Sequence, residues 1–568
     1  MDVRIGVYVC HCGKNIAGTI DVKDVVKFAS RLPNVVVARD YVYMCSSIGQ
    51  ELIKKDIKEL GINRVVVAAC SPTMHLATFQ RVVEEAGLNR YLLEMANIRE
   101  KCSWVHDDVK EATEKAKRII AMAVSKVAIL EPLDRIKRSI TRRVLIIGGG
   151  IAGIHAAIEL SKAGIETVIV EKTPTIGGKM LFFDKTFPTL DCAQCILAPR
   201  ISEVSKAENV KILTNAEVIE VDGSIGNFSA KILIKPRYVD IQKCVACGKC
   251  EEACPVNVDN EWWFGLGKRK AIYIPFPQAY PTAYVIDSKS CLRLRLKKDV
   301  CGLCMKACDR GAIDFNMKEE IIQEYVGAIL VAIGGEIFDA SKVVEYGFGR
   351  FKNVITGIQF EVLTNVAGPT GGELICPGNR KKPHTIVFVQ CVGFRNERYN
   401  EYCCRIGCME SIKHAILAKE KLGDVEIYIC GIDIRTFGKG YEEFYRRARE
   451  EGIKFIAGVP SEIKEDSDGS LIVDVYDATL DKVLKIKADL VVLPTGYIGG
   501  ENHERISQIL KIPRSPDGFI LEKHPKLDPC STPIPGIYVA GVAQGPKDIP
   551  DLSLIHISEP TRPRLISY

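Results

Sequence analysis

The chain has 568 residues, 22 cysteines and a formal net charge of +6. Its length predicts three to four domains, and its charge is small and spread along the chain, so it predicts no nucleic-acid partner. No apolar run reaches the roughly 18 residues of a membrane span, and the N-terminal sequence MDVRIGVYVCHCG has too short an apolar core for a signal peptide, so we expect a cytoplasmic protein without a membrane span.

The cysteines are the most informative part of the composition. A cytoplasmic chain rarely keeps disulfides, because that compartment holds thiols in the reduced state. Thiolates are soft ligands that bind zinc and iron–sulfur clusters. The spacing of the cysteines must therefore distinguish these sites from one another and from buried, unligated thiols.

Residues 1–138 are predicted to form an N-terminal α/β domain with an iron–sulfur cluster. Apolar runs of strand type, separated by helical stretches such as 47–60, are each followed by a cysteine: Cys10, Cys45, Cys70 and Cys102. Parallel sheets bind ligands beyond the carboxyl ends of their strands, so we expect these thiols to converge as cluster ligands, with Cys12 as a further candidate. The alternative is that they are small buried hydrophobes at strand ends.

A strand–turn–helix pattern within residues 142–180 predicts a dinucleotide-binding fold. Three glycines follow the strand with G-x-G-x-x-G spacing, and the next strand ends at an acid: Gly148, Gly150, Gly153 and Glu171. Such glycines let a pyrophosphate approach a helix N-terminus, and the acid can bind a ribose hydroxyl. The following Gly178 and Lys179 indicate FAD, because this stretch resembles the Glu-x(n)-Gly-Gly pattern of two-dinucleotide-fold flavoproteins of the thioredoxin reductase class.

The flavoprotein fold is predicted in two parts, residues 139–235 and 319–551. Within the second part, two stretches resemble the paired strand-and-glycine motifs of that class, 326–333 and 490–497. The stretch 535–541 resembles the late strand that approaches the flavin at Gly541. An aspartate usually follows this glycine in the class, whereas this chain has Val542, so it departs from the class at the usual ribityl contact.

Residues 236–318 are predicted to be an inserted ferredoxin domain with two [4Fe–4S] clusters. Its first cysteine run has the spacing C-x2-C-x2-C-x3-C-P, and its second run is stretched. In two-cluster ferredoxins the fourth cysteine of each run binds the other cluster. The expected ligands are Cys244, Cys247, Cys250 and Cys308 for one cluster and Cys254, Cys291, Cys301 and Cys304 for the other. A zinc ribbon is the alternative, but it seldom needs eight cysteines.

A second strand–helix–strand unit, with strands at 385–389 and 425–430, lacks the glycine triplet of a nucleotide site. Its first turn instead contains Cys391, Cys403, Cys404 and Cys408. We infer a degenerate nucleotide-binding module in which an iron–sulfur cluster replaces a nicotinamide site. The alternative is a degenerate fold with buried thiols.

Three further features are left without a firm role. Cys192 and Cys195 form a C-x-x-C pair that could be a redox dithiol, a pair of cluster ligands or a structural pair. Cys376, Cys430 and Cys530 are expected to be unligated. Residues 552–568 are atypical for the fold and resemble translated sequencing-adapter readthrough, so we expect the genuine sequence to stop near Asp551 and the natural protein to be longer.

Taken together, the motifs resemble those of the heterodisulfide reductase A-subunit family, the iron–sulfur flavoproteins of CoB–CoM heterodisulfide reductase. The resemblance covers residues 1 to about 551 and rests on VYVCHCG, AACSPTMH, EMANIREKCSWVH, GGGIAGI, PTLDCAQC, the inserted ferredoxin run and the CC-x3-C segment. It implies an oxidoreductase of methanogenesis-type metabolism that bifurcates electron pairs, sending one electron toward ferredoxin and the other toward the disulfide CoM-S-S-CoB. Implied partners are the other subunits of such a complex, a hydrogenase or formate dehydrogenase module, ferredoxin and a second copy of the chain.

Other functions remain as alternatives. A related flavin subunit serves quinone-interacting oxidoreductases of sulfate metabolism. An NAD(P)H-dependent reductase similar to the glutamate synthase small subunit is a different class, and the missing second glycine triplet argues against it. A non-enzymatic electron-relay scaffold would differ from all of these in holding no stoichiometric flavin.

Overall fold

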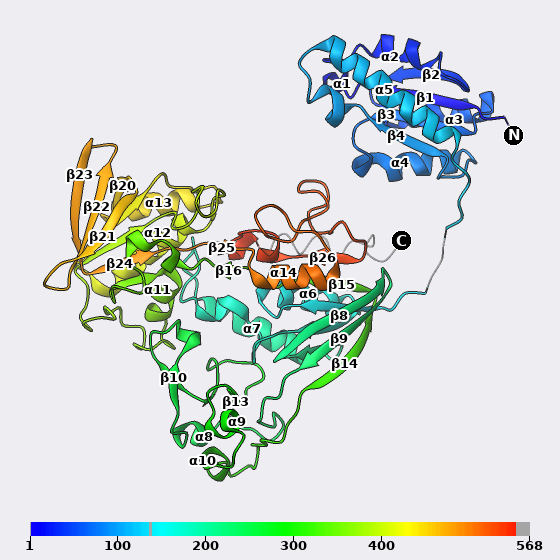
Figure 1. Ribbon diagram of the computed structural model, residues 1–568. Coiled ribbons are helices and arrows are strands. Elements are labelled where there is room, and N and C mark those ends of the chain that lie inside the picture. Colours follow the sequence, from blue (N-terminus) through cyan, green and yellow to red (C-terminus); the bar gives the residue numbers. More distant parts are fainter. Residues whose placement is uncertain (1, 136–138, 552–568) are drawn as a thin grey trace. The chain divides into compact units, whose positions relative to one another are not determined.

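Figure 1 shows the computed structural model, which describes residues 2–135 and 139–551. The chain divides into two compact units, Met1–Arg138 and Ser139–Tyr568, and each unit is described by itself. The atypical stretch 552–568 lies outside the described residues. In the described part of the chain, no helix combines the length and apolar character that a membrane crossing requires.

The first unit contains a four-stranded parallel sheet with the order β2-β1-β3-β4. Its strands are β1 (Ile5–Cys10), β2 (Val35–Tyr41), β3 (Arg64–Ala69) and β4 (Leu93–Asn97). Helices α2 (Val22–Ala29) and α5 (Val109–Ala128) pack on one face, and α3 (Ser47–Leu60) and α4 (Pro72–Glu85) pack on the other. The chain leaves the neighbouring strands β1 and β3 in opposite directions, toward β2 and toward β4, so the crevice between their carboxyl ends is where such a sheet binds ligands.

Capping residues set the ends of these helices. The Ser46 hydroxyl accepts a hydrogen bond from the Gly49 N–H at the start of α3, and Gly61 ends that helix with φ 60°, a conformation that costs glycine little. The Asp108 carboxylate accepts the Glu111 N–H at the start of α5 (2.7 Å). The Ser46 and Asp108 caps each satisfy a backbone N–H group that the helix itself leaves unpaired.

The second unit contains two five-stranded parallel sheets with corresponding strand orders. The first, β26-β15-β5-β6-β7, is built from β5 (Arg143–Ile147), β6 (Glu166–Val170), β7 (Val210–Leu213), β15 (Ala328–Val331) and β26 (Ile537–Val539). The second, β17-β24-β18-β19-β20, is built from β17 (Val354–Thr356), β18 (Thr385–Val389), β19 (Glu426–Gly431), β20 (Lys454–Ala457) and β24 (Leu490–Leu493). These sheets confirm the predicted α/β class.

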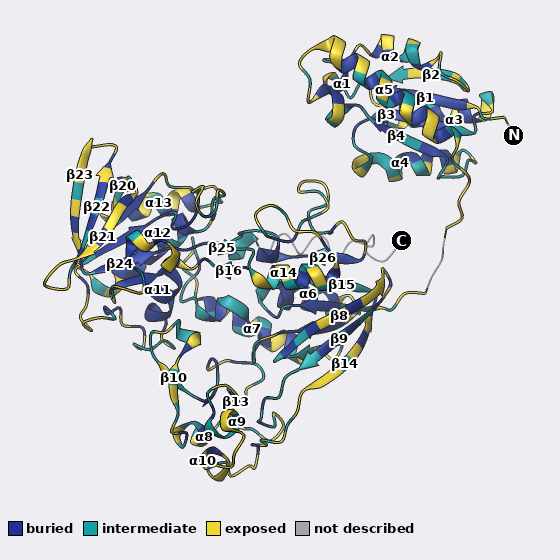
Figure 2. Ribbon diagram, in the orientation of Figure 1, coloured by how far each residue is buried: buried dark blue, intermediate teal, exposed yellow. Residues whose placement is uncertain are grey.

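In each parallel sheet a helix follows the central strand, and a separate antiparallel sheet accompanies each of them. Helix α6 (Ile151–Lys162) follows β5, and helix α12 (Gly407–Leu422) follows β18. The antiparallel sheets are β8 (Ala216–Ser224), β9 (Asn227–Ile234) and β14 (Glu320–Val326) for the first, and β21 (Pro460–Glu465), β22 (Leu471–Asp477) and β23 (Lys482–Ala488) for the second. Strands β14 and β23 expose many of their residues, whereas β24 is buried along its whole length (Figure 2).

The segment between β9 and β14 consists of short elements. Strands β9 and β14 pair directly, with Ile234 opposite Glu320, so the segment leaves and re-enters the sheet at adjacent positions. Its helices are α8 (Lys249–Glu252), α9 (Leu292–Leu296) and α10 (Leu303–Lys306).

One buried arginine connects this segment to the first parallel-sheet module. The Arg237 guanidinium donates hydrogen bonds to the carbonyl oxygens of Pro174 (2.8 Å), Ala283 (2.9 Å) and Tyr284 (2.9 Å). A buried guanidinium with three acceptors is costly to displace, so these contacts fix the base of the segment.

Candidate functional site

A large cavity in the second unit has a volume of about 460 Å³. It lies at the carboxyl ends of four strands of the first parallel sheet, which line it with Ile147, Val170, Ala332 and Ala540. Helices α11 (Gly357–Thr364) and α12 line its other end. This is the usual ligand position of an open parallel sheet.

The glycine turn after β5 contains two kinds of glycine. A Cβ at Gly153 would lie 2.0 Å from the Gly148 oxygen, and a Cβ at Gly148 (φ 112°) would lie 2.3 Å from the Ala332 oxygen. Gly150 differs, because the atom nearest to its Cβ would be the Gly178 Cα at 3.9 Å. Close packing against neighbouring backbone explains why residues 148 and 153 must be glycine, whereas the space beside Gly150 is open to a ligand.

A second glycine loop packs against this turn. The Gly177 N–H donates a hydrogen bond to the Gly149 oxygen (2.7 Å). A Cβ at Gly178, whose φ is 60°, would lie 2.9 Å from the Gly150 Cα. The two backbones therefore approach closely at the N-terminus of α6, where free N–H groups suit the pyrophosphate of a dinucleotide.

Glu171 lies at the end of β6 and is only 7% exposed. Its two carboxylate oxygens accept the N–H groups of Gly149 (2.7 Å) and Thr173 (2.8 Å). Each oxygen keeps a second lone pair, so the carboxylate can also accept a ribose hydroxyl. The residue lines the cavity, in the position that the sequence predicted for it.

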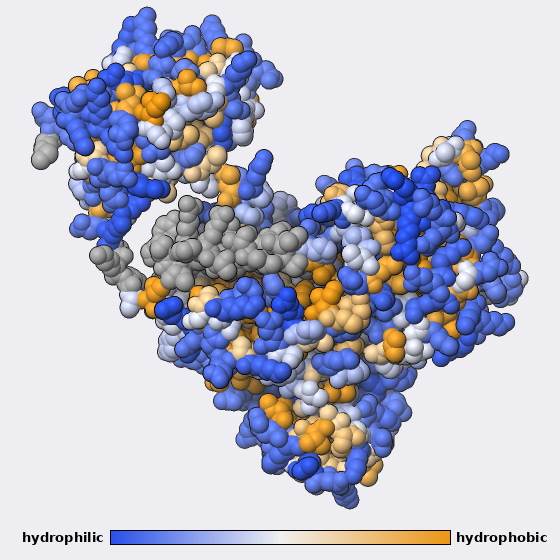
Figure 3. All heavy atoms as spheres, turned by 180° about the vertical axis from the view of Figure 1, so that it is seen from behind, coloured by the Kyte–Doolittle hydropathy of each residue, from blue (hydrophilic) through white to orange (hydrophobic). Residues whose placement is uncertain are grey.

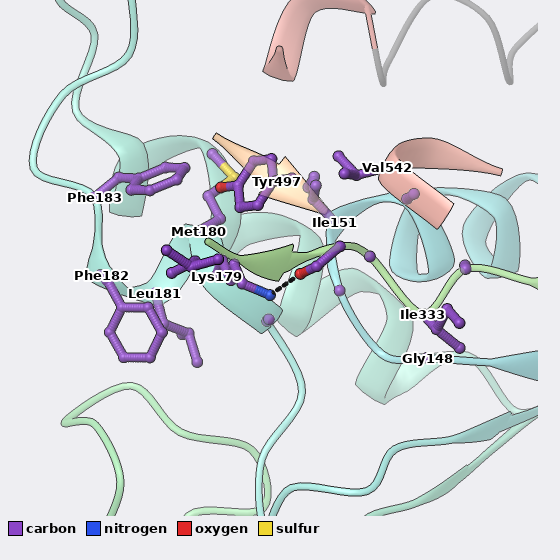
Figure 4. A pocket seen from close by; sticks show the side chains of 18 of the residues that line it. Gly148, Ile151, Lys179, Met180, Leu181, Phe182, Phe183, Ile333, Tyr497 and Val542 are labelled. Atoms are coloured by element: carbon purple, nitrogen blue, oxygen red, sulfur yellow. Dashed lines mark hydrogen bonds between the residues drawn. The ribbon is translucent and has the colours of Figure 1, made fainter. Parts of the chain in front are cut away.

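Lys179 extends along the cavity wall (Figure 4). Its ammonium group donates a hydrogen bond to the Gly335 oxygen and lies 5.6 Å from the centre of the Tyr497 ring. Burial lowers the pKa of Lys179 to about 8. Close to neutral pH the side chain can therefore carry its charge or lose it, depending on what occupies the cavity.

Gly541 follows β26 with φ 69°, and the next residue turns an apolar side chain into the cavity. Val542 packs beside Ile151 (Figure 4). The carboxylate that flavoproteins of the resembled class usually place here is replaced by a hydrocarbon side chain, so Val542 offers no side-chain acceptor to a ribityl hydroxyl. Asp548 lines the same cavity and accepts a hydrogen bond from the Tyr441 hydroxyl.

A buried ionic group forms the far end of the cavity. Glu361 is 1% exposed, and its carboxylate accepts hydrogen bonds from the Lys413 ammonium and, at 2.7 Å, from the His414 ring. Burial works to raise the pKa of Glu361, but Lys413 and His414 outweigh it and lower the pKa to about 2. Charges so deeply buried are costly unless paired, and here the Glu361 carboxylate and the Lys413 ammonium are paired with each other, whereas the buried His414 Nδ1 has no hydrogen-bond partner among the described residues.

Glu410 lies one helical turn before Lys413 and also lines the cavity. Burial raises its pKa to about 8, against the opposing effect of the Lys413 charge and with a smaller contribution from the negative charge of Glu361. The carboxyl is therefore protonated at neutral pH and can donate a hydrogen bond into the cavity.

The sequence reasoning missed this polar end of the cavity. Glu410, Lys413 and His414 have i, i+3, i+4 spacing on α12, whose other buried positions are apolar except for Ser411. A polar stripe on the buried side of a helix is a signal that could have found these three residues. Glu361, which is hydrogen-bonded to Lys413 and His414, is 52 positions from Lys413 and 53 from His414 in the chain, and no local pattern points to it.

The inserted segment contains two smaller cavities, each lined by four cysteines. One, of about 120 Å³, is lined by Cys244, Cys247, Cys250 and Cys308. The other, of about 20 Å³, is lined by Cys254, Cys291, Cys301 and Cys304. The structure thus brings together the same two sets of four that the crossed ferredoxin pairing predicts.

These cavities suit clusters better than single ions. No three His, Cys, Asp or Glu side chains within residues 2–135 and 139–551 converge tightly enough to hold one metal ion. A [4Fe–4S] cluster presents one iron to each thiolate, so its ligands surround a cavity. Burial and the neighbouring Cys244 and Cys308 thiols raise the pKa of Cys250 to about 12, a cost of ionisation that bound iron would remove.

The turn after β18 brings a third set of thiols together. Each of Cys391, Cys403, Cys404 and Cys408 acts electrostatically on at least one other member of the set. Hydrogen bonding from Cys404 lowers the pKa of Cys403, and the positive charges of Arg435 and Arg395 add to this effect. Cationic surroundings of this kind stabilise thiolates.

In the first unit, the thiols that meet are not those of all four strands. Cys12 and Cys45 act electrostatically on Cys10, and Cys10 and Cys12 act on Cys70. Cys10 and Cys12 lie at the end of β1, Cys70 follows β3, and Cys45 lies between β2 and α3. The Arg99 guanidinium donates a hydrogen bond to the Cys12 sulfur (3.4 Å). This group lies in the crevice beyond β1 and β3 that the strand order identifies.

Cys102 is placed elsewhere. It is 0% exposed and packs in the hydrophobic core between the sheet and α5, with Ala112 and Ala116 as neighbours in that core. A short π-helix, Arg99–Ser103, follows β4 and turns Cys102 inward. The structure therefore brings Cys12, and not Cys102, to the other three thiols.

Comparisons with known proteins support both FAD and [4Fe–4S] clusters as cofactors. Residues 143–181 match the family described as FAD dependent oxidoreductase, and residues 237–258 match the family described as 4Fe-4S binding domain. Among solved structures, the thioredoxin reductase of T. acidophilum is similar with a TM-score of 0.40 and 13% identity, covering 73% of this chain and 94% of that chain.

Relatives match nearly the whole chain. It is 54% identical to one of the iron-sulfur A subunits of the CoB--CoM heterodisulfide reductase of Methanopyrus kandleri, over 96% of this chain and 83% of the relative. It is 51% identical to the A subunit of the H(2):CoB-CoM heterodisulfide,ferredoxin reductase of Methanothermobacter thermautotrophicus, over 96% of this chain and 82% of the relative.

Proposed function

The chain belongs to the heterodisulfide reductase A-subunit family, and from that premise we propose that it is the electron-transferring, bifurcating subunit of a heterodisulfide reductase-type complex. It is an oxidoreductase with FAD and [4Fe–4S] clusters. In this proposal, electrons come from a hydrogenase- or formate dehydrogenase-type donor. They leave toward ferredoxin and toward CoM-S-S-CoB or an analogous disulfide, substrates that the names of the relatives support.

The residues of the large cavity have distinct tasks in this proposal. FAD supplies a carrier that accepts electrons in pairs and can release them singly, whereas each cluster carries one. The backbone at Gly150 and Gly178 would hold the pyrophosphate, and Glu171 would bind the ribose. Lys179 and Glu410 would donate hydrogen bonds from the buried end, where both have a pKa of about 8.

One observation carries the proposal: the second parallel sheet has four thiols where a nicotinamide-dependent enzyme binds the phosphates of its nucleotide. The set formed by Cys391, Cys403, Cys404 and Cys408 follows β18, and Ile406 of the same turn lines the large cavity. A cluster held there would give the flavin a one-electron neighbour in place of a hydride donor.

We assign four clusters to the described residues. Two belong to the inserted segment, one to the turn after β18 and one to the first unit. For the last, the electrostatic contacts favour Cys10, Cys12, Cys45 and Cys70 as ligands. Cys12→Ser should then remove about four iron atoms per chain, whereas Cys102→Ser should leave the iron content unchanged. The opposite result would return Cys102 to the ligand set.

Assembly with partners completes the proposal. We expect the chain to form a homodimer within a larger complex that contains the donor module. Exposed apolar side chains at the tip of the inserted segment (Figure 3) fit such an assembly, since they surround its cysteine cavities; they include Val245, Leu296, Val300, Leu303 and Met305.

The proposal is tested by measuring whether the reduction of ferredoxin is coupled to the reduction of the disulfide. A complex isolated anaerobically with its partner subunits, identified by mass spectrometry, should reduce ferredoxin with the donor only while CoM-S-S-CoB is also being reduced. Omitting the disulfide serves as the control. Ferredoxin reduction at an equal rate in that control would contradict bifurcation, and absence of the disulfide-reducing subunits from the isolated complex would contradict the assembly.

A further inference from the structure

The pair Cys192 and Cys195 has no part in the function proposed above. Cys192 is the N-cap of α7 (Ala193–Lys206), and its sulfur accepts the Cys195 N–H at 3.3 Å. The two thiols are also hydrogen-bonded to each other. They are therefore close enough for a small change of side-chain rotamer to join them.

A purely structural role does not fit the burial of this helix. The inward positions Ala193, Leu197 and Ile201 recur every four residues and belong to a hydrophobic core. Cys192 is only partly buried and Cys195 is exposed, and neither belongs to that core. Their sulfur atoms therefore contribute little packing energy, while both remain accessible from solvent.

The surroundings of the pair favour a reactive thiolate over a cluster ligand. Burial opposes ionisation of Cys192, but hydrogen bonds from the Cys195 thiol and from backbone N–H groups outweigh it and lower the pKa. The nearby Lys185 charge acts in the same direction. The three cysteine sets of this unit that were described above each contain four thiols. Cys192 and Cys195 form a pair instead: each shifts the pKa of the other, and no third thiol of the described residues is among the groups that shift them.

The residues between the two cysteines are hydrogen-bonded to the segment that lines the large cavity. The Ala193 N–H donates to the Asp184 oxygen (3.0 Å), and the Gln194 side chain donates to the oxygens of Met180 (3.2 Å) and Leu181 (3.1 Å). Met180 and Leu181 line the cavity. The residues between the two cysteines are thus hydrogen-bonded to the segment that faces the flavin site.

We propose that Cys192 and Cys195 are a thiol–disulfide exchange site, whose substrate class is a small solvent-borne disulfide and whose oxidation state is transmitted through Gln194 to the flavin cavity. The geometry that supports this is an accessible C-x-x-C pair at a helix start, with its intervening residues anchored in the cavity wall. The proposal needs neither the electron donor nor the ferredoxin of the proposed function, and its small disulfide reacts directly with the two thiols rather than receiving electrons through the flavin and the clusters.

The reaction balances without a further reagent. The Cys192 thiolate attacks a disulfide R–S–S–R, which forms a Cys192–S–S–R bond and releases one RS⁻. Cys195 then loses its proton and attacks the Cys192 sulfur, which forms the Cys192–Cys195 disulfide and releases the second RS⁻. The two thiols of the protein are oxidised by two electrons, and the small disulfide is reduced to two RSH after proton uptake.

The test uses the anaerobic holoprotein and the neutral probe 2-hydroxyethyl disulfide. Trypsin cleavage after Lys185 and Arg200 gives one peptide that contains both cysteines. In the natural sequence this peptide should lose two hydrogens, without retaining the probe. Cys195→Ser should instead accumulate the probe on Cys192, and Cys192→Ser should be modified at Cys195 at least about tenfold more slowly.

Two further measurements complete the test. Oxidation should shift the visible flavin spectrum of the natural sequence, and Gln194→Ala should still form the disulfide but lose that shift. Iron and FAD contents should be the same in all variants. Equal modification rates in both cysteine variants, or a peptide that stays reduced, would overturn the proposal. A loss of about four iron atoms from either cysteine variant would also overturn it, by making the pair cluster ligands.

Discussion

The two parallel sheets of the second unit have corresponding strand orders, and yet the turns that follow their central strands differ completely. After β5 the chain has Gly148, Gly150 and Gly153, and a cavity of about 460 Å³ opens beside them. After β18, the corresponding strand of the other sheet, three cysteines occupy the turn before α12, and a fourth, Cys408, lies in the first turn of that helix. One fold therefore presents two different chemistries at the same topological position.

This difference shows how the tasks of fold and turn are divided. The parallel sheet supplies the position, because helix N-termini and strand ends meet at its carboxyl edge. The turn supplies the chemistry. Glycine exposes backbone N–H groups to a phosphate, whereas cysteine side chains cover that surface and offer thiolates to iron.

The largest expected effect comes from the glycine turn. Gly150→Val should leave the fold intact, because a Cβ there meets no atom closer than 3.9 Å, but its methyl groups would enter the pyrophosphate space and abolish FAD binding. Visible absorbance and FAD content of the purified protein measure this. Gly153→Ala is the contrasting change, since its Cβ would lie 2.0 Å from the Gly148 oxygen, and we expect little folded protein. A Gly150→Val protein with full FAD content would refute our placement of the phosphate.

The cysteine turn should show the complementary behaviour. Four clusters correspond to about 16 iron atoms per chain, and Cys404→Ala should reduce this by about four while FAD remains bound. Anaerobic iron analysis provides the measurement. Cys430→Ala is a matched control, because Cys430 is a buried thiol at the end of the adjacent strand β19 and lies outside the set of four. Unchanged iron in the Cys404 variant would leave the turn as an unmetallated fold.

A smaller effect is expected from the buried end of the flavin cavity. Glu410 has a pKa of about 8 in the folded protein and a pKa near 4.5 when unfolded. Between these values the folded state keeps a proton that the unfolded state releases, so stability falls as pH rises, by up to about 1.4 kcal/mol per pH unit.

Glu410→Gln should therefore reduce the fall in thermal unfolding midpoint between pH 6 and pH 8. The exposed Glu401 of the same segment provides the matched control, Glu401→Gln, which should behave like the natural sequence. An equally steep fall in the Glu410 variant would mean that this carboxyl does not hold its proton in the cavity.

The smallest expected effect is the response to a pyridine nucleotide. NADH and NADPH should not reduce the flavin, because the turn after β18 lacks the glycine backbone that would bind their phosphates. Stopped-flow absorbance under anaerobic conditions measures this directly. Rapid bleaching by NADH would show that the second sheet still binds a nucleotide, and the contrast between the two turns would then not hold.

Much of the fold was predictable because strands and helices here follow clear patterns. The predicted strand 385–389 is β18, and the predicted helix 47–60 is α3, since apolar runs and capping residues mark their ends. The two sets of four thiols in the inserted segment followed from spacing alone, although their role as ligands remains a prediction.

The rest of the fold and of the site could not be predicted, because it depends on contacts between residues that are far apart in the sequence. Cys102 lies in the hydrophobic core because a five-residue π-helix turns its side chain inward, and residue spacing does not reveal that rotation; its role as a ligand, like that of Cys12, stays a prediction. The buried pairing of Glu361 with Lys413 joins two helices and becomes visible only when they pack.

The attachment of the inserted segment to β9 and β14 has a consequence for how such a protein can evolve. Ile234 and Glu320, the residues at its two ends, already face each other across a hydrogen-bonded pair of strands. Bringing the two ends of an inserted segment together costs conformational entropy. Here the pairing of β9 with β14 already holds the two ends side by side, so the insertion adds little of that entropic cost. A whole electron-carrying domain can thus be gained, exchanged or lost at this point as a cassette, while the sheet beneath it keeps its register.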